Sequence, residues 1–136
     1  MKSNNIRPCV IGLGYVGLPI FFNLSNKFDT CGYDTNTSRI NELKKKNDAN
    51  LEFQKKEFKF KKKSFFTNKE QDLKNSNFYI ITVPTPIKPN KKPDLKYISQ
   101  AINSIRKYLK KNDIVILEST VFPGITENFC GNILKK

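Results

Sequence analysis

The chain of 136 residues contains no histidine and no tryptophan, and it has only three cysteines. Those cysteines, Cys9, Cys31 and Cys130, are widely separated, and no Cys-x-x-Cys pair is present. Zinc sites of the Cys/His type and Ser–His or Cys–His nucleophile systems are therefore excluded within this chain. A disulfide framework is not expected either. Cys9 and Cys31 lie in apolar, strand-like runs, which favours buried core thiols.

Acidic residues are scarce relative to basic ones. The chain has 25 Lys and Arg against 12 Asp and Glu, a formal net charge of +13. Such an excess raises the hypothesis of a nucleic-acid-binding module. However, the excess is mostly lysine, whereas specific base readers rely on arginine. The lysines interleave with Phe53, Phe58 and Phe60, so nonspecific affinity at low salt remains an alternative to a solvated lysine face with inward phenylalanines.

Long hydrophobic runs are also missing. The first apolar segment, Cys9–Val16, is broken by Gly12 and Gly14 and predicts neither a secretory signal nor a membrane span. The expected compartment is therefore the cytoplasm. Hydrophobic residues make up 38% and charged residues 27% of the chain, as in ordinary soluble domains. The length suits a single domain with a real core.

Short β-like runs alternate with helical patterns, which is typical of βαβ units and a mostly parallel sheet. Strands are expected near Cys9–Leu13, Thr30–Asp34, Ser64–Thr67, Phe78–Val83 and Asp113–Glu118. Helices are expected at 17–28, from a cap among 35–37 to about 46, at 94–109 and at 125–134. Residues 47–63 are helical only in patches, and four prolines within 84–93 predict a rigid loop.

These elements predict an α/β, Rossmann-type doubly wound fold in which residues 1–136 form one dinucleotide-binding domain. A six-stranded version of this fold needs at least one further strand, so we expect the domain to be incomplete at its C-terminal end.

The segment Gly12-Leu-Gly-Tyr-Val-Gly17 is a GxGxxG motif between a predicted strand and a predicted helix. Gly12 allows the tight turn, Gly14 allows the backbone to approach a pyrophosphate, and Gly17 lets the helix pack closely on the sheet. The amides and dipole at the helix start favour a diphosphate there. The six-residue pattern is weak alone, but its context predicts a dinucleotide site.

Asp34 ends the second predicted strand, 34 − 12 = 22 residues after the first glycine. A carboxylate at about this spacing accepts the ribose hydroxyls of NAD and repels the 2′-phosphate of NADP. The alternative role of Asp34 is that of a helix cap. Arg39 is close enough to contact the adenosine end, where its charge would permit NADP, or it is an exposed helix arginine.

Two further loops follow the carboxyl ends of strands, where ligands bind in open α/β sheets. Pro84-Thr-Pro86 follows one strand and Ser119-Thr120 follows the next. Thr85 and Thr120 are candidates to present hydroxyls to the cofactor, and ordinary turn chemistry is the alternative for both.

Taken together, these segments resemble the UDP-glucose/GDP-mannose dehydrogenase family in its N-terminal NAD-binding domain. The resemblance rests on residues 10–19, 32–34, 78–86, 93–95 and 118–124. These segments include the motifs Val-Pro-Thr-Pro and Glu-Ser-Thr-Val-Phe-Pro-Gly. It is strongest to the branch that oxidises UDP-N-acetylhexosamines for bacterial surface polysaccharides.

The resemblance implies a placement for each candidate residue. It places Gly12, Gly14, Tyr15, Val16 and Gly17 at the pyrophosphate of NAD. Asp34 and Arg39 would lie at the adenosine ribose, Thr85 would contact the cofactor, and Thr120 would lie near the nicotinamide and the reacting centre.

The resemblance also implies the reaction. Family members oxidise a sugar C6 alcohol to a carboxylate in two hydride transfers with two NAD. A cysteine thiol, aided by a lysine and an acid, holds the aldehyde-level intermediate as a covalent adduct. Family members are commonly oligomers when full length. The glycine-rich cysteine motif, the lysine and the central and UDP-binding domains are not found in these residues, and Cys130 is read as a packing residue. We therefore expect no turnover from this chain alone. A remnant that associates with a full-length dehydrogenase is a further alternative.

Overall fold

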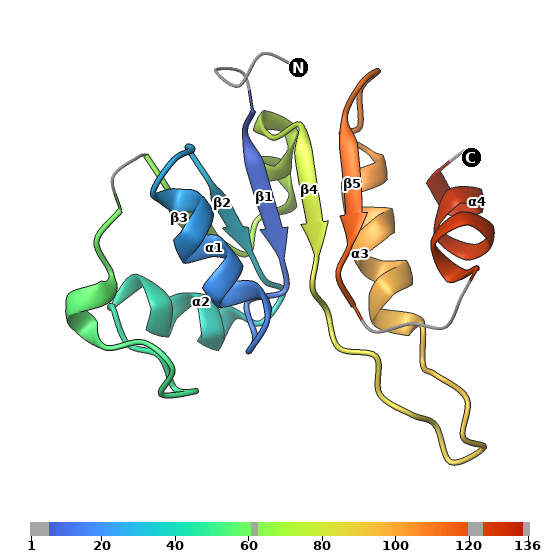
Figure 1. The fold of residues 1–136 in the computed structure, drawn as a ribbon, viewed down its shortest axis with the longest axis horizontal. Helices are drawn as coiled ribbons and strands as arrows, with labels where there is room; N and C mark the ends of the chain where they lie inside the picture. Colours follow the sequence, from blue (N-terminus) through green and yellow to red (C-terminus); the bar gives the residue numbers. More distant parts are fainter. Residues whose placement is uncertain (1–5, 61–62, 120–123, 135–136) are drawn as a thin grey trace.

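A computed structural model describes residues 6–60, 63–119 and 124–134. Five strands form one sheet in the order β3-β2-β1-β4-β5. The strands are β1 (Pro8–Ile11), β2 (Cys31–Tyr33), β3 (Phe65–Thr67), β4 (Phe78–Ile81) and β5 (Ile114–Leu117). All the pairings are parallel, and the chain reverses its winding direction between β1 and β4, as in doubly wound folds. The predicted fold class is confirmed, and Figure 1 shows the strands pointing the same way.

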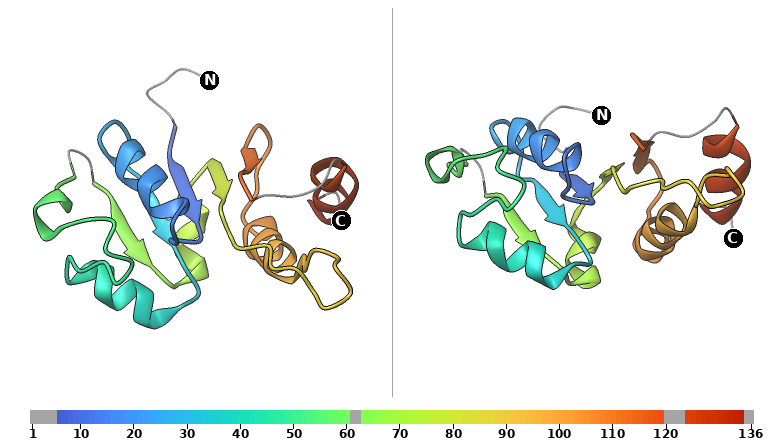
Figure 2. Two further views of the ribbon diagram at one scale, coloured as in Figure 1. Left: turned by 60° about the horizontal axis from the view of Figure 1, so that its bottom comes forward. Right: turned by 90° about the horizontal axis from the view of Figure 1, so that it is seen from below.

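Helices connect the strands. They are α1 (Gly17–Ser25), α2 (Thr37–Lys44), α3 (Lys96–Arg106) and α4 (Gly131–Leu134), with short 3-10 turns η2 (Lys55–Glu57) and η3 (Glu70–Asn75) and a π-helical segment η4 (Ile125–Cys130). Figure 2 shows α1 and α3 on opposite faces of the sheet. Each crossover therefore covers a different half of the core, and both faces of the central strand β1 are buried.

The core divides into two apolar clusters, one on each face of the sheet. One contains α3, η3 and η4 residues, and the other contains α1, α2 and the aromatic side chains of the segment after α2. In the second cluster, Phe22 stacks on Phe53 with ring centroids 4.4 Å apart and meets the edge of Phe58 at 5.0 Å. Lys55, Lys56 and Lys59 in the same segment are exposed. The predicted inward phenylalanines and solvated lysines are confirmed for the described part of this segment.

Several predicted helix boundaries need correction. Helix α1 ends at Ser25 and not at residue 28. Helix α3 ends at Arg106 and not at Leu109, because the chain turns at Tyr108, whose N–H donates to the Ile105 carbonyl. Its N-cap is Leu95, and Asp94 accepts the Lys96 N–H at 3.0 Å from one position further out. The last predicted helix begins as η4, with a wider turn than an α-helix, before α4.

The segment that follows α2 is mostly irregular. Only η2 is helical among its described residues, whereas the 3-10 turn η3 before β4 was not predicted. The polar composition of residues 47–60 gives little local signal, and the path of this segment is set instead by the buried Asp48 described below.

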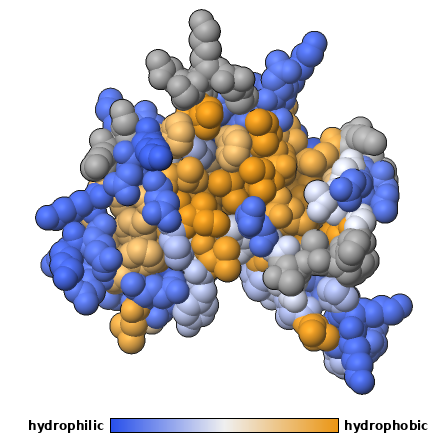
Figure 3. All heavy atoms as spheres, in the orientation of Figure 1, coloured by the Kyte–Doolittle hydropathy of each residue, from blue (hydrophilic) through white to orange (hydrophobic). Residues whose placement is uncertain are grey.

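One face of β4 and β5 carries apolar side chains that are only partly covered. Phe78 pairs in register with Ile114, so both point to the α1 side, and Ile114 is 41% exposed. Figure 3 shows hydrophobic side chains gathered on this face between α1 and α4. A further strand beside β5 remains a prediction. No helix in the described part of the chain is long and apolar enough to cross a membrane.

The start of α1 lies unusually close to the sheet. Gly12 has a φ of +93°, the left-handed region that favours glycine. A Cβ added at Gly17 would lie 1.8 Å from the Gly12 carbonyl oxygen and 2.4 Å from Thr82 Oγ1, whereas one added at Gly14 would meet nothing within 4 Å. Gly17 is therefore required for packing, and Gly14 borders open space.

We expect Gly17→Ala to destabilise the fold by about 3 kcal/mol or more, because a methyl group there overlaps backbone that has no room to move. The matched change Gly14→Ala should alter the free energy of unfolding by less than about 1 kcal/mol. Urea unfolding of both variants measures the difference, and equal midpoints would show that the close packing of α1 is not a constraint.

Candidate functional site

Two adjoining hollows lie at the carboxyl edge of the sheet. The larger, about 510 Å³, and the smaller, about 360 Å³, share six lining residues: Gly14, Asp34, Asn36, Thr82, Val83 and Pro84. The larger also extends over Tyr15, Val16, Arg39, Asn50, Glu118 and Ser119. In Figure 1 this edge is where the loops after β1, β4 and β5 meet. It is the crevice in which parallel sheets of this topology bind ligands.

The glycine turn leads from β1 into α1 along the floor of these hollows. Among the described residues no side chain caps the start of α1, and its first turn has no acidic residue. The positive end of the helix dipole is therefore available to an anion. The Leu18 and Ile20 N–H groups already donate to the Gly14 and Val16 carbonyl oxygens and Pro19 has no N–H, so in this turn an anion can use only amides that precede Leu18. Since Gly14 borders open space, a phosphate can approach the backbone closely.

Thr82, at the end of β4, fixes this turn from below. Its hydroxyl lies 2.7 Å from the Gly12 carbonyl oxygen and 3.0 Å from that of Ile11, and its side chain faces the space that a Gly17 Cβ would need. Thr82 is not among the site residues predicted from the sequence. Its position directly before Val-Pro places it at the end of a strand, but nothing local indicates that its hydroxyl turns back to β1.

Asp34 follows β2 and faces both hollows. Its Oδ2 accepts the Leu13 N–H and its Oδ1 accepts the Asn36 N–H, each at 2.8 Å. Each carboxylate oxygen keeps a further lone pair for a ligand hydroxyl. Asn36 is the N-cap of α2, and its side chain accepts the N–H groups of Ser38 and Arg39. The helix-cap alternative for Asp34 is therefore wrong.

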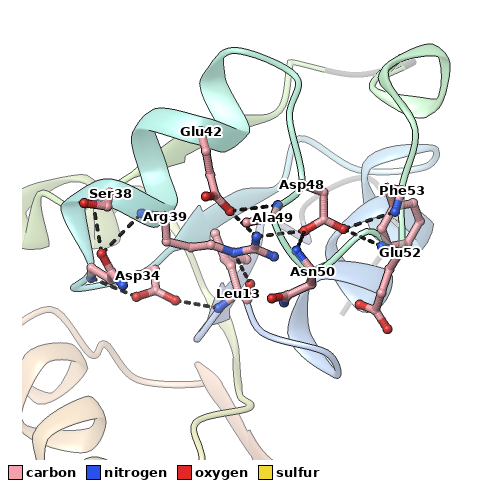
Figure 4. A network of polar contacts seen from close by, with 11 residues as sticks. Leu13, Asp34, Ser38, Arg39, Glu42, Asp48, Ala49, Asn50, Glu52 and Phe53 are labelled. Carbon is pink, nitrogen blue, oxygen red and sulfur yellow. Dashed lines mark hydrogen bonds and ion pairs between the residues drawn. The ribbon is translucent and has the colours of Figure 1, made fainter.

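Arg39, in the first turns of α2, is buried and not an exposed helix arginine. Its Nε donates to the Leu13 carbonyl oxygen at 2.8 Å, and its Nη1 donates to Asp48 Oδ1 at 2.8 Å and also pairs with Glu42. Figure 4 shows the guanidinium lying between the glycine turn and the segment after α2. Arg39 thus links the floor of the hollow to residues 48–53.

Asp48 is the anchor of that segment, and its side chain is fully buried. Beyond its ion pair, it accepts backbone N–H groups from Asn50 at 3.1 Å, Glu52 at 3.0 Å and Phe53 at 3.1 Å. Burial alone would raise the pKa of the Asp48 carboxyl, but the hydrogen bonds from Arg39 and the backbone outweigh burial and hold this pKa below its ordinary value. Burial opposes the charge of Arg39, and the two carboxylates outweigh it, so the pKa of Arg39 is raised.

The remaining predicted site residues divide into three groups. Tyr15 and Val16 are 67% and 53% exposed at the mouth of the larger hollow. Thr85 is half-buried but is not among the residues that line either hollow. In the loop after β4, the last lining residue is Pro84. Thr120 lies outside the described residues.

None of the three cysteines, which all fall within the described ranges, offers an accessible thiol. Cys9, Cys31 and Cys130 are free and buried, which confirms their interpretation as core residues. Burial is the main cause that raises the pKa of Cys9 and of Cys130, so these thiols are poor nucleophiles.

This geometry agrees with a comparison with known protein families. Residues 6–136 match the NAD binding domain of the UDP-glucose/GDP-mannose dehydrogenase family. The chain belongs to this family. The cofactor of the domain is NAD, and the open backbone at Gly14 together with the free lone pairs of Asp34 fits a diphosphate and an unphosphorylated ribose.

Individual proteins similar to this chain include several nucleotide-sugar dehydrogenases. A UDP-N-acetyl-D-glucosamine 6-dehydrogenase of Pseudomonas aeruginosa is 46% identical over 97% of this chain and 31% of its own length. The enzyme of the same name from Salmonella typhi is 42% identical over 98% of this chain. Among solved structures, a UDP-D-ManNAc dehydrogenase of Pyrococcus horikoshii matches with a TM-score of 0.82 and 32% identity, over 96% of this chain and 33% of that one. The chain therefore spans about a third of the length of these relatives.

The buried Arg39–Asp48 pair predicts a pH-dependent contribution to stability. Because the pKa of Asp48 is lowered in the folded chain, its contribution is complete above the unfolded value of about 3.9 and is lost as the pH falls through the folded value. We expect Asp48→Asn to lower the free energy of unfolding by roughly 2–3 kcal/mol between pH 5 and 8, because the buried guanidinium of Arg39 is then left with Glu42 as its remaining acidic partner.

Urea unfolding at several pH values measures this contribution. The difference between Asp48→Asn and the parent should shrink below about pH 4. The exposed acid Glu52, in the same segment, supplies the control Glu52→Gln. A difference for Asp48→Asn that persists unchanged at low pH would contradict an ionic role.

Proposed function

We propose that this chain holds NAD across the carboxyl edge of its sheet, as the cofactor-binding portion of a nucleotide-sugar dehydrogenase. The observation that carries the proposal is the meeting of an open glycine backbone at Gly14 with the carboxylate of Asp34, joined through the Leu13 peptide. An anion site and a diol site are thereby held side by side, as a dinucleotide requires.

Each end of the crevice has its own role. The pyrophosphate lies against the turn Gly12–Gly17, with Tyr15 and Val16 at its open side. The adenosine ribose lies at Asp34, beside Arg39. NAD supplies the hydride acceptor, and the residues of this chain bind and orient it.

The nicotinamide end points toward the loops after β4 and β5. The hollow reaches Glu118 and Ser119 there, and the Ser119 hydroxyl donates to the Val83 carbonyl oxygen at 2.6 Å, which ties the two loops together. Thr120 follows directly in the chain and is proposed to lie near the reacting centre. Thr85 is proposed to contact the cofactor through the same pair of loops.

The proposed reaction is oxidation of the C6 alcohol of a UDP-sugar, of the UDP-N-acetylhexosamine class, to a uronate for surface polysaccharide. Conversion of an alcohol to a carboxylate removes two hydrides and adds one oxygen atom from water, so two NAD and one water are consumed and protons are released. Support comes from the names of the Pseudomonas aeruginosa and Salmonella typhi relatives. Because Cys9, Cys31 and Cys130 are buried, we propose that the reacting thiol is not one of them, so these residues alone do not turn over substrate.

Other partners of the enzyme are proposals of the same kind. A cytoplasmic location and a homo-oligomeric full-length enzyme accord with a dehydrogenase that acts on a nucleotide sugar. A role in nucleic-acid binding gains no support from the described lysine segment, since Phe58 is buried in the core and Phe53 and Phe60 pack against it, each partly buried.

The glycine turn is tested by Gly14→Val. This change should abolish detectable NAD binding, or weaken it at least about 100-fold, because the side chain fills the space of the phosphate. Isothermal titration with NAD measures the affinity, and circular dichroism and urea unfolding verify that the variant is folded. A folded Gly14→Val variant that binds NAD like the parent would show that the pyrophosphate lies elsewhere.

The ribose site is tested by Asp34→Ala. Loss of the carboxylate should weaken NAD about 10- to 100-fold, since two charge-assisted hydrogen bonds are lost, and should raise NADP affinity relative to NAD. Parallel titrations with the two dinucleotides give the ratio. An unchanged ratio would refute contact between Asp34 and the ribose.

A further inference from the structure

Arg39 is a cation beside the proposed ribose site. Asp34 accepts the Leu13 N–H, and Arg39 donates to the Leu13 carbonyl oxygen, so the two side chains flank one residue of the glycine turn (Figure 4). Arg39 also lines the larger hollow together with Asp34 and Asn36. A guanidinium in this place is the natural partner for a phosphate on the ribose 2′-oxygen.

The charge of Arg39 is, however, already compensated. Its Nη1 contacts both Asp48 and Glu42, so this group of three carries 1 − 2 = −1 charge, and Asp34 adds another negative charge nearby. Asp48 cannot follow Arg39 toward a ligand, because three backbone N–H groups hold its carboxylate in place. A 2′-phosphate, with about −1.5 to −2 charge, would therefore be repelled by the net negative charge of these four side chains.

The guanidinium nevertheless retains an unused donor. Its Nη2 is buried and has no hydrogen-bond partner within the described ranges. Release of Nη1 from Asp48 would leave Nη1 with Glu42 as its remaining acidic partner and Nη2 unpaired, which brings the fork closer to the arrangement that suits bidentate phosphate binding.

On this basis, and resting on the proposed function, we propose that Asp48 is a specificity-determining residue that acts through Arg39 to favour NAD over NADP. Asp34 excludes the 2′-phosphate directly. Asp48 excludes it a second time by neutralising Arg39, the cation that lines the same hollow. Removal of Asp34 relieves the direct repulsion and weakens NAD, and a further gain in NADP affinity requires that Arg39 be released as well.

The test is a set of double variants in this chain, titrated with NAD and with NADP at low and moderate salt. Asp34→Ala/Asp48→Asn should bind NADP about tenfold more tightly than Asp34→Ala, the order expected from one unit charge near the ligand. Asp34→Ala/Glu42→Gln should also bind NADP more tightly than Asp34→Ala. Glutamine at position 42 keeps an oxygen acceptor for the Ala49 N–H. This second variant tests the proposal if Asp48→Asn fails to fold. The gain should shrink as salt rises.

Two controls separate this role from a merely structural one. Asp34→Ala/Glu52→Gln removes the same charge from an exposed acid of the same segment and should leave NADP affinity at the level of Asp34→Ala. Adding Arg39→Met to Asp34→Ala/Asp48→Asn should abolish the gain, and Arg39→Lys should restore part of it.

Three outcomes decide the matter. A gain that needs Arg39 supports the proposal. A parent chain that binds NAD, with NADP affinity equal in all Asp34→Ala backgrounds, overturns the role of Asp48 and leaves the NAD site standing. A folded parent that binds neither dinucleotide overturns the proposed function and this inference together.

Discussion

The close approach of α1 to the end of β1 is the constraint on which the rest of the site depends. Only hydrogen at Gly17 lets the helix start lie against the Gly12 carbonyl and the Thr82 side chain. With the helix in that position, the glycine turn that leads into it lines the crevice where β1, β4 and β5 end. Core packing and the proposed anion site thus both depend on the side chain that Gly17 lacks.

The Leu13 residue extends this constraint to the second strand and beyond. Its N–H binds Asp34 and its carbonyl oxygen binds Arg39, so the glycine turn, β2 and α2 are held in one arrangement. Arg39 continues the connection to Asp48, which organises a segment that has little regular structure. This polar network therefore orders the start of the segment, while Phe53, Phe58 and Phe60 hold the rest of it against the core. The stability that this network contributes depends on the ionised carboxylate of Asp48. An unpaired buried guanidinium at Arg39 would be costly in free energy.

Local patterns were sufficient to predict most of the fold. Apolar runs bounded by glycine or proline located the five strands to within a few residues, and the spacing from Gly12 to Asp34 located a carboxylate that lines both hollows. The contacts that were missed have no local sequence signature. The Arg39–Asp48 pair joins α2 to the irregular segment that follows it, and the Thr82 hydroxyl reaches carbonyls 70 and 71 residues earlier. Thr85 was predicted from its motif, whereas in the loop after β4 the last residue that lines either hollow is Pro84.

The central claim is that a diphosphate binds the backbone at the start of α1. Amide chemical shifts of the ¹⁵N-labelled chain, followed during addition of NAD, test it most directly. The account predicts the largest changes at Gly14, Tyr15 and Val16, with smaller ones at Asn36 and none at Lys55 and Lys56. Shifts confined to the lysine segment, or no shifts in the glycine turn at saturating NAD, would contradict it.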